Sequence, residues 1–160
     1  MRLSAIALPI CVLLAVSGCT DEKGDNPATV SPPTPAPASS ALPGDAAKAE
    51  LKRLQPGLDP TSPQGAGPLA PSMGNTLMGK PAKSGTVEFV FACSGDSIVN
   101  ILIHDRQALV PEAEGQLQCD GRDGFKRTIP VTTESALSFQ ATATTLKDGG
   151  YAYAWSGDIK

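Results

Sequence analysis

The chain has 160 residues, with 13 Lys and Arg against 16 Asp and Glu and a formal net charge of −3 at pH 7. The acidic excess lies from Gly85 onward, where ten acids stand against six bases. Because phosphate backbones repel a mildly acidic protein, we exclude nucleic acids as partners.

A short apolar run, residues 5–16, follows Arg2 and leads into residues 14–19, with the sequence LAVSGC. Small residues directly before a cysteine look like a bacterial lipobox, which predicts a lipoprotein signal peptide over residues 1–18. The run is shorter than the roughly 20 residues that span a bilayer. Cleavage would leave Cys19 carrying acyl chains, which anchor the protein to the extracytoplasmic face of the cell membrane. Secretion without a lipid on Cys19 stays the alternative.

Residues 19–84 are rich in Pro, Ala, Ser and Gly. Such a composition buries too little apolar surface to offset its ordering entropy, so we expect a flexible, disordered tether after the lipidated Cys19. The tether would hold a folded domain away from the membrane.

Two parts of this tether carry more pattern. Residues 45–55 are good helix formers behind Asp45, a candidate N-cap, and they stop before Pro56. An isolated helix of this length is marginal in water, so we expect it to form only transiently. Residues 69–78 carry Leu and Met among Gly and Pro. We expect a loose linker there, with packing on the domain edge or against a partner as alternatives.

Residues 85–160 alternate β-branched, aromatic and polar residues between Gly/Asp turns, which predicts six strands. We expect them at residues 86–93, 97–103, 115–119, 125–132, 136–144 and 150–156. The second is nearly all apolar, which is typical of a central strand buried on both faces. The pattern predicts an all-β domain, a small antiparallel β-sandwich or barrel.

Four cysteines occur in the chain. Cys11 would leave with the signal peptide and Cys19 would carry the lipid, so Cys93 and Cys119 remain as one pair. In an oxidising compartment we expect them to form a disulfide, worth about 3–4 kcal/mol by the chain-entropy argument. Zinc is the rival use of two thiols, but a structural site needs four ligands and only His104 could add an imidazole.

The sequence Cys93-Ser94-Gly95 follows a Val/Phe strand, and Cys119-Asp120-Gly121 precedes a threonine-rich strand and a C-terminal aromatic strand. With the lipobox and the Pro/Ala-rich tether, this arrangement resembles small actinobacterial lipoproteins. The resemblance implies an anchor, a tether and a β-sandwich, and it implies no active site.

Candidate catalytic groups are sparse. His104 and Asp105 are adjacent, and Ser97 lies seven residues earlier, but a hydrolase triad needs all three to converge in space. Glu112 and Glu114 could act as paired carboxylates in glycoside cleavage. We expect a surface histidine and a solvated loop instead, and therefore no enzyme and no cofactor.

Asp120 and Asp123, with Asp96, stand in Gly-rich turns, where carboxylates can gather around Ca²⁺. Their spacing does not match an EF-hand loop, so we expect turns and no metal, with Asp120 and Asp123 as the first ligands to test.

Tyr151, Tyr153 and Trp155 alternate along the last predicted strand. Exposed, they would form a candidate binding surface for a glycan or a protein; buried, they would be the largest side chains of the core. The burial interpretation is favoured, and both stay open from the sequence.

The sequence therefore predicts a lipid-anchored, extracytoplasmic binding module that catalyses nothing. Its partners would be the membrane, through Cys19, and an unknown protein or cell-envelope glycan. The alternative is a factor that protects the envelope by inhibiting a hydrolase such as lysozyme.

Overall fold

The computed structural model describes residues 43–77, 79–145 and 147–159. The expected signal peptide, Cys19 and the first part of the expected tether lie outside these residues. The described part forms one helix, one 3-10 turn and eight strands: α1 (Asp45–Leu54), β1 (Gln64–Pro68), β2 (Met73–Thr76), β3 (Gly85–Asp105), β4 (Ala108–Leu109), η1 (Pro111–Ala113), β5 (Gly115–Asp120), β6 (Phe125–Val131), β7 (Leu137–Ala143) and β8 (Gly150–Ser156).

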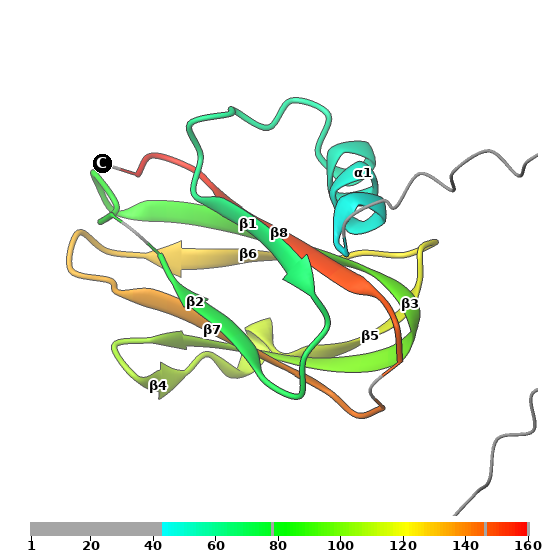
Figure 1. The fold of residues 1–160 in the computed structure, drawn as a ribbon. Coiled ribbons are helices and arrows are strands. Elements are labelled where there is room, and N and C mark those ends of the chain that lie inside the picture. Colours follow the sequence, from blue (N-terminus) through cyan, green and yellow to red (C-terminus); the bar gives the residue numbers. More distant parts are fainter. Residues whose placement is uncertain (1–42, 78, 146, 160) are drawn as a thin grey trace, which may run out of the picture. The chain divides into compact units, whose positions relative to one another are not determined.

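The long strand β3 organises the fold. Its first half pairs with β6 and β8, and its second half pairs with β5 and β7, always antiparallel. The register shifts between Ser94 and Ile98, around Gly95 with its positive φ of 122°. This irregularity lets the strand bend, and the eight-stranded sheet curls into a half-barrel (Figure 1). The expected all-β antiparallel fold is confirmed.

The main core fills the inside of the curl. Alternate residues of β3, β5, β6, β7 and β8 point inward, as the sequence pattern predicts. Its centre is aromatic: the rings of Phe89 and Trp155 lie 4.4 Å apart, and those of Phe89 and Phe139 lie 5.0 Å apart. Burial of these large rings contributes to the apolar stabilisation of the domain.

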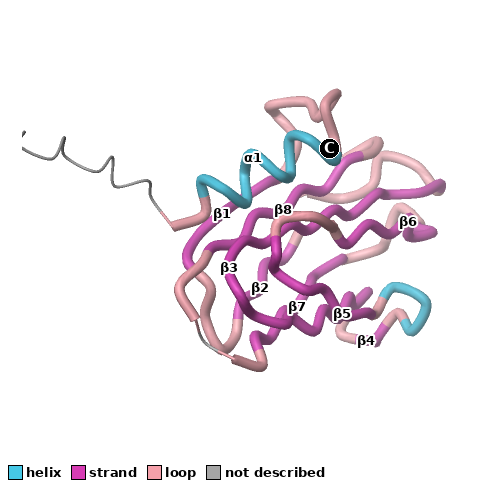
Figure 2. The backbone as a smooth tube through the Cα atoms, turned by 90° about the vertical axis from the view of Figure 1, so that its right-hand side faces the viewer, coloured by secondary structure: helices cyan, strands magenta, loops and turns pink. Residues whose placement is uncertain are grey.

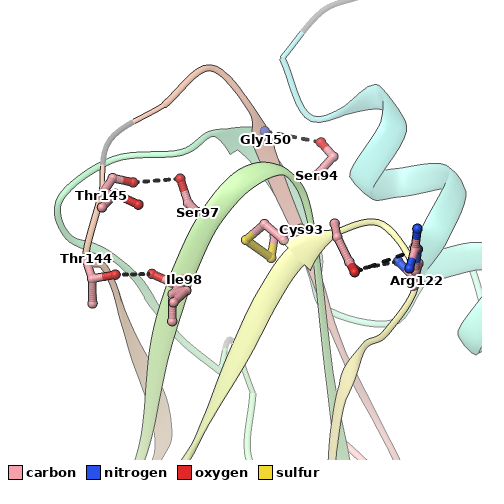
Figure 3. Close-up of a disulfide and its surroundings, with 10 residues drawn as sticks. Cys93, Ser94, Ser97, Ile98, Arg122, Thr144, Thr145 and Gly150 are labelled. Atoms are coloured by element: carbon pink, nitrogen blue, oxygen red, sulfur yellow. Dashed lines mark hydrogen bonds and ion pairs between the residues drawn. A yellow bond between two sulfur atoms is a disulfide. The ribbon is translucent and has the colours of Figure 1, made fainter.

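The expected disulfide is present. Cys93 and Cys119, 26 residues apart in sequence, are bonded with their Cα atoms 4.9 Å apart. Both side chains are fully buried, where the bend of β3 meets the end of β5 (Figure 3). The bond therefore ties β5 to β3 at the bend of β3.

Residues 45–54 form a stable part of the domain, which corrects the expectation of a transient helix in a tether. Gly44 rather than Asp45 is the N-cap, and acidic Asp45 and basic Arg53 sit at the helix ends that their charges favour. The apolar face packs on the outside of the sheet. There it forms a second cluster of buried residues: Ala47, Leu51, Val90, Ala92, Ala152 and Ala154.

Strands β1 and β2 also correct the expected tether. β1 pairs with β8 and β2 pairs with β7, so the two strands form the edges of the curled sheet. Leu69, Met73 and Leu77 are buried in the main core rather than in a loose linker. The folded domain thus includes residues 43–77 and 79–84, and the expected boundary at residue 85 lies too late in the chain.

The expected second strand differs from the structure in two respects. Residues 97–103 continue β3 instead of forming a separate strand, and their outer face is half-buried at Ile98, Asn100 and Leu102. The helix explains this, because α1 covers the outer face of the first half of β3 at Val90 and Ala92 only.

Candidate functional site

The aromatic stripe of β8 is core and not a binding surface. Trp155 is 0% exposed, Tyr153 is 5% exposed and Tyr151 is half-buried. The residues lie on the inner face of the curl, so the exposed platform considered from the sequence does not form. Their size is used to fill the core.

Glycines of β1 make room for the two tyrosines. A Cβ at Gly65 would lie 2.7 Å from the ring of Tyr153, and one at Gly67 would lie 3.3 Å from the ring of Tyr151. Burial raises the pKa of the Tyr153 hydroxyl, and a hydrogen bond from Asn75 acts in the opposite direction. The Gly-rich sequence of β1 is therefore a packing requirement of this sheet.

Ser97, His104 and Asp105 do not converge. Ser97 and His104 point to opposite faces of β3: Ser97 is fully buried like Val99, Ile101 and Ile103, whereas His104 belongs to the alternate, half-buried positions. Ser97 Oγ is buried and donates to the carbonyl of Thr145 at 2.6 Å (Figure 3). Asp105 accepts hydrogen bonds from Ser135 Oγ and the Ala136 amide at 2.8 and 2.7 Å. Ser97 and Asp105 thus have structural partners, and the three residues form no triad.

The carboxylates considered for a metal lie in turns. Asp120 Oδ1 accepts from the Arg122 amide at 3.0 Å, and Asp96 forms an ion pair with Lys147. No group of three or more His, Cys, Asp or Glu within the described ranges is arranged to hold a metal ion. Glu112 is exposed in η1 and Glu114 follows it, at the surface.

A different site stands out between α1 and the edge strand β1. α1 begins beside Gly67, runs along β8 and ends at Leu54, and the Nε2 of the next residue, Gln55, donates to Ser156 Oγ at 2.8 Å. The loop of residues 56–63 then returns to β1 (Figure 2). These three segments enclose an open groove of about 340 Å³. We call it the α1–β1 groove; its lining is Lys48, Leu51, Lys52, Pro56, Leu58, Pro60, Gln64, Gly65 and Ala66.

One wall of the α1–β1 groove is an unpaired strand edge. The register matches Gln64 with Ala154, and the Trp155 amide donates to Pro63 while the Leu69 amide donates to Gly149. In an antiparallel ladder, hydrogen-bonded pairs alternate with non-bonded ones. Gln64 and Ala66 are therefore the non-bonded positions, and their amides and carbonyls point away from β8. Within the described part of the chain, no strand pairs with this side of β1.

The charged side chains of the groove are both positive. Lys48 and Lys52 lie one helical turn apart on α1, on the side that faces the groove. Lys48 forms an exposed ion pair with Asp45 at 3.3 Å, and the described residues give Lys52 no ion-pair partner. The rest of the lining is apolar or amide in character. The groove thus combines an apolar floor, a basic rim and unpaired backbone groups.

One wall of this groove, the helix, could be predicted from the sequence, and the other wall, β1, could not. The apolar face of residues 45–55 is visible in the sequence, and helical spacing places Lys48 and Lys52 beside it. β1 has no such signal, because QGAGP lacks the β-branched residues of a typical strand.

Comparisons with protein-family profiles, with curated proteins and with solved structures find no match to this chain. In the described residues no helix is long and apolar enough to cross a membrane. The α1–β1 groove is thus identified from its geometry alone.

Proposed function

We propose that this protein is a lipid-anchored, extracytoplasmic binding module that presents the α1–β1 groove to a partner protein. The observation that carries the proposal is the groove itself, an apolar cleft with a basic rim beside an unpaired strand edge. Unpaired edges invite pairing with another chain, and proteins usually cover or charge them. An open one beside a cleft supports a binding role.

The sequence supports the anchored placement. In this proposal, Cys19 carries the lipid and residues 20–42 are the tether, shorter than the sequence pattern first predicts. A buried disulfide joins Cys93 to Cys119 in the folded domain, which suits the oxidising side of a membrane.

A binding role is also favoured over catalysis by where the reactive side chains lie. Ser97 is buried and bonded to a backbone carbonyl, and Asp105 anchors the turn at Ser135. The groove is lined by lysines, prolines, aliphatic side chains, Gln64 and Gly65, without a carboxylate, histidine or thiol among them. Such a lining favours recognition over acid–base chemistry.

The anchor is tested by labelling cells with an alkyne analogue of palmitate. We expect the label on the full chain and its loss in Cys19→Ala. Labelling that survives Cys19→Ala would contradict the anchor.

The partner is tested by photo-crosslinking in intact cells, with a photoreactive residue in place of Pro56 or Gln64. Both line the groove and are exposed. Matched probes at Glu112 and Gln118 are exposed and lie outside the groove lining. We expect one protein adduct from the groove probes and none from the controls. Equal adducts from all four positions, or none from the groove, would refute the proposal; adducts with glycan alone would replace the protein partner.

A further inference from the structure

We propose that the α1–β1 groove binds an extended acidic peptide segment, which adds as a strand to the free edge of β1 and directs two carboxylates at Lys48 and Lys52. The inference rests on the proposed binding function and names its partner by chemistry. Three features of the groove support it: the outward-pointing amides and carbonyls of Gln64 and Ala66, the spacing of the lysines and the apolar floor.

The backbone groups of β1 select an extended chain. Gln64 and Ala66 each direct an amide and a carbonyl outward, as derived from the β1–β8 register. A peptide in strand conformation can exchange paired hydrogen bonds with these positions, which is the mode called β-strand addition. A helical ligand has already satisfied its own backbone groups and could not use them.

The spacing of the lysines fits a strand. Lys48 and Lys52 are four residues apart on a helix, which places them about 6 Å apart along its axis. Alternate side chains of a strand point to one face and are about 6.6–6.8 Å apart. Two acidic residues at positions i and i+2 of a bound strand can therefore face one lysine each.

The apolar lining adds a second requirement. Leu51, Leu58 and Pro56 surround the groove together with the methyl group of Ala66. Aliphatic side chains next to the acidic pair would cover this lining and exclude water from it. The expected ligand is thus an extended segment with the pattern acid-x-acid and flanking aliphatic residues.

An anionic membrane surface is the rival source of negative charge. Binding to anionic lipid headgroups generally uses clusters of about four to eight basic residues. The groove offers only Lys48 and Lys52, and its unpaired backbone groups would find no matching partner in a headgroup layer. These observations favour a peptide.

The test is a selection from a display library of random extended peptides. The target is the chain from residue 19 onward with Cys19→Ser, so that no lipid is attached. We expect enrichment of acid-x-acid sequences among aliphatic residues. The highest-affinity peptide should lose at least about tenfold in affinity on Lys52→Glu, whereas Lys83→Glu, an equal charge change outside the groove, should leave it unchanged. Enrichment of sequences without acidic residues would overturn the proposal.

Strand addition is tested from both sides. Ala66→Pro removes an outward amide that β8 does not use, and proline is tolerated there in an edge strand. It should weaken binding about tenfold, whereas Ala66→Ser should not. Peptide N-methylation avoids any change to the protein: methyl groups on the alternate amides that face β1 should abolish binding, and methyl groups on the other set should not. Equal effects of both sets would refute strand addition.

The two proposals fail in different ways. A groove adduct in cells together with insensitivity to Lys52→Glu and to N-methylation would leave a binding module with another ligand and overturn the acidic strand. Stronger retention on vesicles of anionic lipid than on the selected peptide, lost with Lys52→Glu, would replace the peptide by a membrane surface.

Discussion

Asn75 on β2 donates a hydrogen bond from Nδ2 to the hydroxyl of Tyr153 on β8. The two residues are 78 positions apart in the sequence and belong to strands that do not pair with each other. Their bond spans the open side of the curl, where the edge strands β1 and β2 lie. The side-chain bond thus connects β2 and β8 beside the aromatic core, where no backbone hydrogen bonds join these two strands.

Breaking this contact should destabilise the domain, and the effects of substituting Asn75 and Tyr153 should not be additive. We expect a coupling energy between Asn75→Ala and Tyr153→Phe of about 0.5–1.5 kcal/mol, typical of one hydrogen bond in a protein. Urea unfolding of the two single variants and the double variant measures it. The cycle with Tyr151→Phe in place of Tyr153→Phe is the control, and additive effects in both cycles would argue against the bond.

The same tyrosine predicts a loss of stability at alkaline pH. Burial raises the pKa of Tyr153 above its ordinary value near 10. The unfolded chain therefore ionises this hydroxyl first, and stability falls as the pH rises from about 10 through the folded pKa. Below that window the contribution is fully present. Unfolding of the wild type and Tyr153→Phe should be compared from about pH 8 to about pH 12; parallel curves would contradict the prediction.

Gly65 should tolerate no side chain. A Cβ there would lie 2.7 Å from Cε1 of Tyr153, a buried ring that cannot move without opening the core. We expect Gly65→Ala to cost about 1–3 kcal/mol. Gly57→Ala is the control, because nothing lies within 4 Å of its Cβ position. Equal melting temperatures for the two variants would show that Tyr153 is not held against β1.

These glycines also explain why the edge strand β1 could not be predicted from the sequence. Strand prediction relies on β-branched residues and alternation, and both mark β5 to β8 clearly. The segment QGAGP contains neither. Its glycines leave space for the rings of Tyr151 and Tyr153, which lie far along the chain. A requirement set by tertiary contacts leaves no local pattern.

The helix could be predicted from the sequence, but its packing on the sheet could not. Its residues and its apolar face can be read in the sequence, but its stability depends on small residues of the sheet, Ala92, Ala152 and Ala154, that leave room for it. Those alanines look like gaps between aromatic residues until the helix lies over them. The sequence therefore indicates the helical wall of the groove, with Lys48 and Lys52, but it does not predict that β1 lies opposite.

Docking of α1 can be measured directly. Leu51 is 5% exposed and packs in the second cluster. Leu51→Ala should cost about 2–5 kcal/mol, as large-to-small changes in a core do. Lys52→Ala, on the exposed side of the helix, should change stability by less than about 0.5 kcal/mol. Equal stability of both variants would mean that the helix unfolds independently of the sheet.

The hairpin between β3 and β4 carries backbone strain that one substitution should relieve. Arg106 and Gln107 occupy its two central positions with φ of 49° and 71°, and the pair Asp105–Ala108 closes the turn. Both central residues of such a turn need positive φ, which favours glycine and asparagine. The Arg106 side chain forms a contact that glycine would lose, because its Nε donates to the Glu134 carbonyl at 2.9 Å.

Gln107→Gly should therefore stabilise the domain by about 0.5–1 kcal/mol, since glycine adopts this conformation without the Cβ penalty. The same exchange in an ordinary strand should have the opposite sign, and Gln118→Gly in β5 provides it at an exposed position. There we expect a loss of about 0.5–1 kcal/mol, because glycine gives up more chain entropy on folding. Urea unfolding of both variants measures the difference. A loss of stability in both would mean that the Gln107 side chain contributes more to the turn than its backbone strain costs.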